Sequence, residues 1–212
     1  PVSVAAVRRG FARPERCADS QFLRREISAR MFERLALIKA SPQRMLDAGC
    51  GEGDDLLGLQ QAFPSAHLIG LDLSLSMLEQ ARRAGEQSQS GMKQLMSRWL
   101  ARRPASLHAA TLACADFGAL PLGRASLDLV WSNLALHWHP QPHRVIGEWA
   151  GVMRSGGLLM FSSFGPDTFA ELRESFAAAD GDAPLPRILP FVDLHDYGDM
   201  LVEAGFETPV MD

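Results

Sequence analysis

Short apolar runs alternate with segments of helical periodicity along most of the chain. Runs of three to nine residues, bounded by glycine, proline or acidic residues, are typical of strands covered on both faces. They predict five strands and the start of a sixth, at Met45–Ala48, His67–Leu71, Leu107–Ala115, Ser126–Asn133, Leu158–Ser163 and Gly205–Phe206. Between them, apolar positions three or four apart predict helices at 8–39, Asp54–Phe63, Pro142–Met153, Asp167–Ala179 and Asp193–Ala204.

This alternation of strand and helix predicts an α/β fold with a mostly parallel sheet in one domain, 1–212. A further helix starts near Ser74 or Ser76, where Ser76 and Glu79 fit a capping box. Gly156-Gly157 is expected to stop the helix before the fifth strand. Residues 1–40 precede the first strand as a helical segment.

The alternation is interrupted at residues 84–106. G-E-Q-S-Q-S-G is typical of a loop, and Met92–Arg103 fits an amphipathic helix, so we expect an insertion here. The net charge of the chain is −4, yet residues 82–108, which include this insertion, are basic, through Arg82, Arg83, Lys93, Arg98, Arg102 and Arg103. A basic segment on an acidic body favours a local anionic partner over general affinity for nucleic acid, although such a segment is more often only a solvated face.

The chain has three cysteines, Cys17, Cys50 and Cys114, without CxxC spacing. An odd number without that spacing argues against a disulfide framework or a metal site, and favours a reducing, cytoplasmic compartment. No apolar run reaches membrane-spanning length, and the first residues do not fit a secretory signal. The missing initiator Met suggests a processed or trimmed chain.

The stretch R-M-L-D-A-G-C-G-E-G joins the first strand to the next helix through Gly49, Gly51 and Gly53. A glycine-rich turn after a strand commonly holds a nucleotide-like ligand. Asp54, where a dinucleotide fingerprint has a small residue, and Asp55 beside it would repel a pyrophosphate. Asp47, just before the turn, would attract a cationic ligand.

Acids also end the second and third predicted strands. Asp72 stands where such sheets bind a ribose diol, although it could instead cap the next helix. Asp116 could accept from an exocyclic amine, with the ring of Phe117 beside a base, or it could be an ordinary turn acid. A ligand with an ammonium group, a ribose and an adenine, but no phosphate, is S-adenosylmethionine.

L-D-A-G-C-G-E-G, G-L-D-L-S, A-D-F-G-A-L-P-L and D-L-V-W-S-N-L-A-L-H-W together resemble class I S-adenosylmethionine-dependent methyltransferases over residues 42–165. The resemblance implies a Rossmann-like three-layer sandwich with six to seven strands, the last lying beyond Asp212, and an N-terminal lid. It also implies cofactor contacts at Asp47, Gly49, Cys50, Gly51, Asp72, Leu73, Met77, Asp116, Phe117, Asn133 and Leu134.

The N-terminal R-R-G-F-A-R and F-L-R-R-E-I, with S-S-F-G-P-D-T-F-A-E-L-R-E-S-F, resemble the biotin-pathway malonyl-acyl-carrier-protein O-methyltransferases. They also resemble mitochondrial complex I assembly factors that act on protein arginine. The biotin enzymes tend to have a Tyr near position 18, where this chain has Arg16-Cys17-Ala18-Asp19. A protein-arginine hydroxylase and a non-catalytic assembly factor therefore remain alternatives.

If the acceptor is a malonyl carboxylate, it needs no general base, because it is already ionised at neutral pH. It does need a site for an anion, for which Arg24, Arg25 and His137 are candidates, although His137 with Trp138 and His139 could simply be packed. The resemblance implies an acidic acyl-carrier protein as partner, which the basic insertion could steer. The sequence predicts no nucleic-acid or membrane partner and does not indicate an oligomeric state.

Overall fold

The structure is a computed structural model that describes residues 3–99, 110–180 and 187–211; within these ranges the side chains of Arg16, Ala18 and residues 88–99 are not described. Its centre is a parallel sheet of five strands in the order β3-β2-β1-β4-β5. The strands are β1 (Arg44–Ala48), β2 (His67–Asp72), β3 (Thr111–Cys114), β4 (Leu127–Ser132) and β5 (Met153–Phe161). The predicted α/β class is confirmed, because every pairing in this sheet is parallel.

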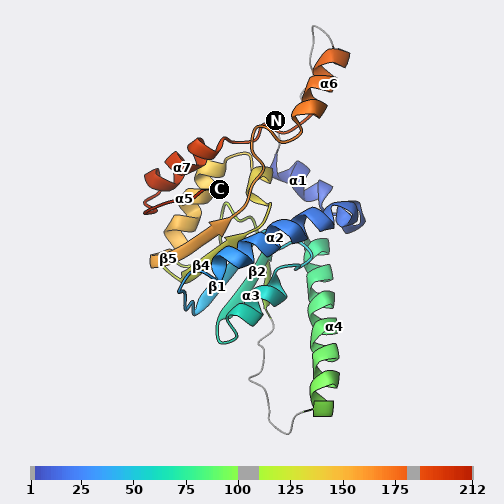
Figure 1. Ribbon diagram of the computed structural model, residues 1–212, viewed down its shortest axis with the longest axis vertical. Coiled ribbons are helices and arrows are strands. Elements are labelled where there is room, and N and C mark those ends of the chain that lie inside the picture. The colour runs from blue at the N-terminus through green and yellow to red at the C-terminus, as the bar shows by residue number, and fades with distance from the viewer. Residues whose placement is uncertain (1–2, 100–109, 181–186, 212) are drawn as a thin grey trace.

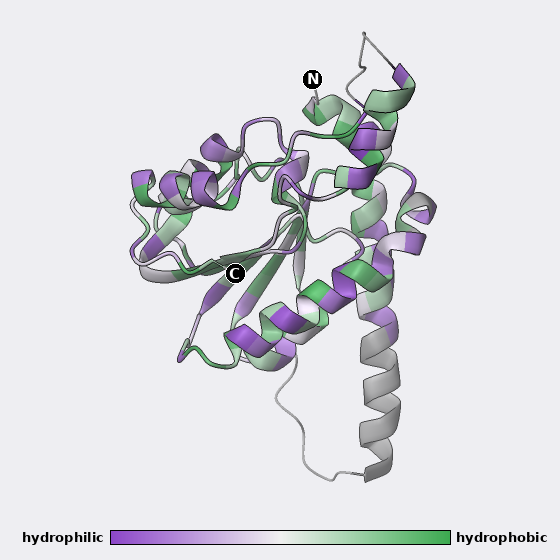
Figure 2. Ribbon diagram, turned by 45° about the horizontal axis from the view of Figure 1, so that its top comes forward, coloured by the Kyte–Doolittle hydropathy of each residue, from purple (hydrophilic) through white to green (hydrophobic). Residues whose placement is uncertain are grey.

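Helices cover both faces of the sheet, which gives the three predicted layers (Figures 1 and 2). Met45, Leu129 and Trp131 pack on one face with α2 (Gln21–Leu35), α3 (Leu56–Ala62) and α4 (Leu75–Trp99). Leu46 and Val130 pack on the other face with α5 (Pro142–Val152) and α7 (Leu194–Glu203). Neighbouring residues of one strand thus serve opposite cores, which is why these strands are apolar almost without interruption.

The predicted helix 8–39 is wrong in its continuity. The chain forms α1 (Val4–Gly10), a 3-10 segment η1 (Pro14–Ser20) and α2. Pro14 has no amide hydrogen and disfavours helical geometry in the residue before it, so a helix cannot run through this point. The break lets α1 lie apart from α2 (Figure 1).

The predicted loop at Gly85–Gly91 is also wrong, because α4 runs without interruption from Leu75 to Trp99. Ser74, not Ser76, precedes the helix, and its hydroxyl accepts from the Met77 amide at 3.4 Å. Two isolated glycines lower helix propensity by only about 1 kcal/mol each, which the remaining residues of a helix can offset. Lys93 and Arg98 have undescribed side chains, and Arg102 and Arg103 lie outside the described residues.

Two strand predictions fail toward the carboxyl end. β5 begins at Met153, directly after α5, so Gly156 (φ +78°) lies inside the strand, at an irregularity in its pairing with β4, and does not stop a helix. The sixth strand does not form between Phe206 and Met211, the described residues after Gly205. Thr208 has a φ of +50° and Pro209 follows it, and neither fits a strand ladder. The described sheet therefore has five strands, not six or seven.

The remaining helices are close to their predicted bounds. α6 spans Ala170–Asp180, and the predicted cap Asp193 accepts from the His195 amide at the start of α7. None of the helices within the described residues is both long and apolar enough to cross a bilayer.

Candidate functional site

The glycine turn after β1 is pinned to the carboxyl end of β2. The amides of Gly49 and Cys50 both donate to the Leu71 carbonyl, at 2.8 and 3.0 Å. The φ angles of Gly49, Gly51 and Gly53 are +81°, +53° and +82°, a region that side chains other than glycine disfavour. Because β1 lies between β2 and β4, the turn stands at the point where the strand order reverses, which is where open α/β sheets bind ligands.

The three glycines have different surroundings. A Cβ built on Gly49 would lie 2.4 Å from the Cβ of Ala135, whereas one built on Gly51 would meet nothing within 4 Å. One built on Gly53 would lie 3.0 Å from the Cβ of Ala81 in α4. Gly49 and Gly53 therefore allow close packing, and Gly51 leaves open space above the turn.

Asp47 lies beneath this turn with 2% of its surface exposed, and its Oδ2 has no partner among the described residues. Burial raises the pKa of this carboxyl well above its usual range, and the negative charges of Asp55, Asp72 and Asp54 raise it further. A buried carboxylate without a counter-charge is costly. The site therefore favours a cationic ligand, or else a proton on Asp47.

Replacing Asp47 by Asn should stabilise the unliganded chain at neutral pH. The folded-state pKa of Asp47 lies above its ordinary value of 3.8. The stability of the chain therefore falls as the pH rises from 3.8 through the folded-state pKa, and the full loss is reached at pH values above the folded-state pKa. We expect Asp47→Asn to raise the Tm at pH 7.5 by several degrees, at roughly 2–4 °C per kcal/mol for a domain of this size, and the gain to shrink toward pH 4.

Melting curves at both pH values measure this effect, with Asp54→Asn as the control. The Asp54 carboxylate already has basic partners, so its replacement should give no gain. A lower Tm for Asp47→Asn at pH 7.5 would show that Asp47 is ionised and paired in the unliganded chain.

Asp72, at the end of β2, holds two loops together. Its carboxylate accepts from the Gly51 amide at 3.0 Å and from the Ser74 amide at 2.8 Å. Burial raises the pKa of Asp72, and amide hydrogen bonds from Ser74, Gly51 and Leu73 oppose that increase. Each carboxylate oxygen can accept more than one hydrogen bond, so these contacts leave capacity for hydroxyl groups of a ligand.

Asp116 and Phe117 follow β3 at the same edge of the sheet. Asp116 accepts from the Gly118 amide at 2.8 Å and lies 3.7 Å from Nε2 of His139. The ring of Phe117 lies 5.8 Å from that of His139 and 3.5 Å from the Cβ position at Gly49. Phe117, which was predicted to lie beside an adenine, is therefore close to the glycine turn, and His139 is a neighbour of both Asp116 and Phe117.

The other predicted cofactor residues also surround this edge. Leu73 lines a cavity of about 610 Å³ together with Val4, Ala5, Arg8 and Arg9 of α1. Met77 in α4 and Cys50 in the turn are both buried. Burial raises the pKa of the Cys50 thiol well above its usual range. Leu134 is buried with a φ of +49°.

Asn133 joins β4 to both β5 and α2. Its side-chain oxygen accepts from Ser162 at 3.0 Å, and its amide nitrogen donates to the Arg24 carbonyl at the same distance. The position of α2 relative to the end of β4 is therefore fixed by a side chain that the sequence predicted to flank a ligand.

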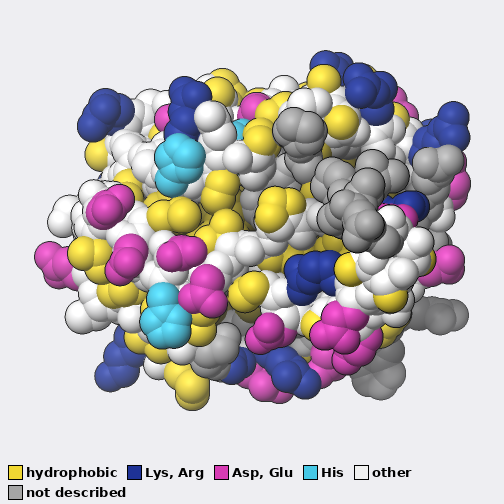
Figure 3. Space-filling view, turned by 90° about the horizontal axis from the view of Figure 1, so that it is seen from above, with side chains coloured by type: hydrophobic (Ala, Val, Ile, Leu, Met, Phe, Trp, Pro, Cys, Tyr) yellow, Lys and Arg dark blue, Asp and Glu magenta, His cyan; other side chains and the backbone are white. Residues whose placement is uncertain are grey.

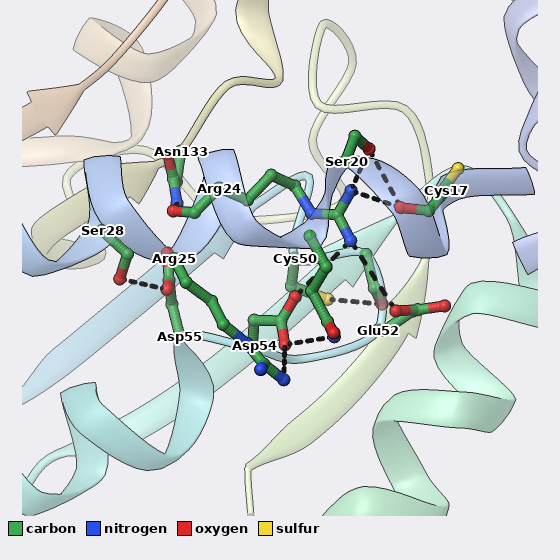
Figure 4. A network of polar contacts seen from close by, with 12 residues as sticks. Cys17, Ser20, Arg24, Arg25, Ser28, Cys50, Glu52, Asp54, Asp55 and Asn133 are labelled. Atoms are coloured by element: carbon green, nitrogen blue, oxygen red, sulfur yellow. Dashed lines mark hydrogen bonds and ion pairs between the residues drawn. The ribbon is translucent and has the colours of Figure 1, made fainter.

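Arg24 and Arg25, predicted as contacts for a substrate carboxylate, are engaged elsewhere. Figure 4 shows both guanidinium groups directed at the acids of the glycine turn. Arg24 lies 3.8 Å from Glu52 and 3.7 Å from Asp54, and Arg25 lies 3.7 Å from Asp54. Glu52 and Asp54 thus form ion pairs with α2 in this structure.

Asp55 has a structural role that the sequence analysis missed. It is buried, and its carboxylate accepts from Trp131 Nε1 at 2.8 Å and from Ser28 at 2.5 Å. Asp55 thus connects three parts of the fold: α2 through Ser28, the sheet through Trp131, and the segment that follows the glycine turn, to which Asp55 itself belongs. One feature of the sequence could have indicated this role: Trp131 lies in a buried strand, and a buried indole N–H needs a hydrogen-bond acceptor.

His137 lies in a short 3-10 segment, η2 (Leu136–Trp138), after β4. Both of its ring nitrogens are buried and have no partner among the described residues. Burial lowers the pKa of the imidazole to about 4, so it is neutral at physiological pH. That His137 contacts a substrate carboxylate stays a prediction, and in the unliganded chain the neutral ring offers one N–H donor and no charge.

The N-terminal segment lies over the same edge of the sheet. The hydroxyl of Ser74 donates to the Phe11 carbonyl at 2.8 Å, and that of Ser76 donates to the Ala12 carbonyl at 3.1 Å. The ring of Phe11 meets Trp138 edge to face at 5.1 Å. From above, hydrophobic side chains gather in the middle of this end of the molecule, with charged groups around them (Figure 3).

Known proteins resemble this chain along nearly its whole length. A malonyl-[acyl-carrier protein] O-methyltransferase of Laribacter hongkongensis is 45% identical over 97% of the chain and 65% of its own length. A protein of the same name from a Methylovorus species is 40% identical over 100% of the chain and 66% of its own length. The chain thus spans slightly less than two thirds of these curated relatives.

Among solved structures, a Haemonchus contortus phosphoethanolamine N-methyltransferase, in complex with S-adenosylhomocysteine, has a TM-score of 0.60. It is 19% identical, and the match covers 84% of this chain and 36% of that one, which shows the shared fold. The sequence family described as "Methyltransferase domain" matches residues 46–161, from β1 to the end of β5. That range contains the glycine turn and all three acids at the strand ends, and the chain belongs to this methyltransferase-domain family.

Proposed function

We propose that the chain binds S-adenosylmethionine and that its protein methylates the free carboxylate of a malonyl group carried on acyl-carrier protein, in biotin synthesis. The proposal for the acceptor rests on one observation, the 45% identity over 97% of the chain to a relative of that name. The proposal for the cofactor rests on the geometry of the glycine turn and the acids around it.

The residues at the glycine turn fit this cofactor. Asp47, buried with an unpartnered oxygen, would favour the cationic methionine moiety, and Gly51 leaves room above the turn. Asp72 would accept from the ribose hydroxyls. The other proposed contacts are Gly49 and Cys50 in the turn, Leu73, Met77, Asp116 and Phe117 around the adenine, and Asn133 and Leu134 near the methyl group.

When bound, the cofactor would supply an electrophilic methyl group on a sulfonium. A malonate carboxylate is ionised at neutral pH, so the protein has no proton to remove from it. What the residues must do is hold the acceptor oxygen in line and keep water away. The N-terminal segment suits the second task, because Phe11 packs on Trp138 and its carbonyl is held by Ser74.

Labelled S-adenosylmethionine and malonyl-acyl-carrier protein test the proposal, with the natural protein that contains this chain as catalyst. We expect label to appear on the malonyl carrier but not on an acetyl carrier, which lacks the carboxylate. The gene should also complement a biotin auxotroph. No transfer and no complementation, with cofactor binding intact, would instead favour the hydroxylase alternative.

We further propose that the basic side chains of 82–103 attract the acidic carrier protein. Replacing Arg98, Arg102 and Arg103 by Glu should raise KM for the malonyl carrier several-fold at low salt, with little change in kcat, because surface charge acts mainly on the rate of association. The difference should shrink at 0.5 M salt, where the Debye length is about 4 Å. An unchanged KM at low salt contradicts the steering role.

A further inference from the structure

A cluster of aromatic rings surrounds His137. Its ring centroid lies 4.6 Å from that of Phe164, 5.2 Å from Trp138 and 5.7 Å from Phe191. Phe169 completes the group, at 6.0 Å from Phe164 and 6.3 Å from Phe191. We call His137, Phe164, Phe169 and Phe191 the ring cluster; its members come from η2, from the segment between β5 and α6, and from the residues before α7.

The ring cluster lies beside the proposed methyl-transfer position. η2 begins two residues after Leu134, and Phe164 comes three residues after the carboxyl end of β5, the neighbour of β4. The cluster also reaches the surface, because Phe169 is 48% exposed. A molecule held in the cluster could therefore extend from the solvent to the edge of the sheet.

Two features of the cluster are costly to the protein alone. The neutral imidazole of His137 has one donor and one acceptor, both buried without a partner among the described residues, and leaving such groups unpaired destabilises the folded chain. Phe169 has a φ of +60°, which is unusual for a bulky residue and is commonly found at binding sites. A ligand that accepts a hydrogen bond from His137 would offset part of these costs.

The chemistry of the cluster favours an uncharged ligand group. Three aromatic rings lie around the His137 ring, and a carboxylate buried among them without a counter-charge would be strongly disfavoured. A carbonyl oxygen needs only one neutral donor, and the rings suit the apolar chain beyond it. A malonyl thioester has such a carbonyl one methylene group away from its carboxylate.

We propose that the ring cluster binds the acyl-thioester part of the acceptor, with the His137 N–H donating to the thioester carbonyl oxygen and Phe164, Phe169 and Phe191 packing against the adjoining chain. This inference rests on the proposed function and assigns His137 a role in choosing the acceptor. Holding the carbonyl fixes the position of the carboxylate one methylene away, so the contact also aligns the oxygen that receives the methyl group.

The test compares two acceptors in the natural protein: a malonyl thioester, and a carboxyethyl thioether that keeps the carboxylate but lacks the carbonyl. We expect the parent protein to favour the thioester by about 10- to 100-fold in kcat/KM, as one buried hydrogen bond allows. In His137→Phe this ratio should fall close to one, while binding of S-adenosylhomocysteine stays unchanged. His137→Gln, which retains an N–H donor, should recover part of the ratio.

Phe169→Ala should raise KM for the thioester several-fold, and Phe22→Ala, an exposed phenylalanine of α2 outside the cluster, should not. If His137→Phe binds S-adenosylhomocysteine normally and keeps the parent ratio, the ring cluster does not bind the thioester, while the proposed function stands. If the parent protein methylates neither acceptor, the proposed function itself fails. If His137→Phe does not fold, His137→Gln and Phe169→Ala decide the question by the same measurements.

Discussion

Replacing Asp72 by Ala should weaken the binding of S-adenosylhomocysteine by at least about 100-fold. The substitution removes two proposed hydrogen bonds between a carboxylate and ribose hydroxyls, each worth roughly 1.5–3 kcal/mol. It also removes the acceptor for the amides of Gly51 and Ser74, so the glycine turn loses its anchor to the start of α4. Titration calorimetry with the purified chain measures the loss.

Asp72→Asn separates these two effects. The amide keeps one oxygen acceptor, so the turn should stay anchored in part, and we expect a smaller loss of about 10-fold. Asp128→Asn is a suitable comparison, because that acid accepts from the amides of Gln43 and Arg44 at the amino end of β1 and should leave ligand binding unchanged. If Asp72→Ala binds the ligand as tightly as the parent chain, the cofactor site has been assigned to the wrong residues.

Gly49→Ala should prevent the chain from folding or lower its free energy of unfolding by more than about 3 kcal/mol. The new Cβ would lie 2.4 Å from that of Ala135, a Cβ is fixed by its backbone and cannot rotate away, and the φ of +81° adds strain. Urea unfolding followed by circular dichroism measures the effect.

Gly51→Ala is the matched control, since it lies in the same turn with positive φ but has nothing within 4 Å of the Cβ position. It should cost only about 1–2 kcal/mol, the strain of a left-handed residue. Equal costs for the two variants would mean that strain, and not the contact with Ala135, makes Gly49 necessary. The double variant Gly49→Ala with Ala135→Gly should then fail to recover stability.

The sequence was sufficient for the parallel α/β class and for the edge of the sheet where the candidate site lies. Asp47, Asp72 and Asp116 were predicted from their places at the ends of apolar runs, and parallel strands bring such ends together at one edge. Helix boundaries were less secure where local propensity and packing disagree. The glycines at 85 and 91 indicated a loop, yet α4 continues through both.

The partners of charged side chains could not be predicted in the same way. Arg24 and Arg25 were expected at a substrate, because nothing in the local sequence shows that α2 crosses the glycine turn and meets Glu52 and Asp54. The neutrality of His137 also depends on Phe164 and Phe191, which are distant in the sequence and become neighbours only through the sheet. Such contacts are products of tertiary structure, whereas strand ends follow from local pattern.

The rate at which the buried Cys50 thiol is alkylated depends on how often the glycine turn opens. Alkylating reagents react with thiolates, and a buried thiol with a raised pKa has almost none at neutral pH until the turn opens. Cys114 is exposed and reacts without such opening. The ratio of the two alkylation rates therefore reports how often the turn opens, and a ligand bound over it should slow Cys50 in proportion to its occupancy.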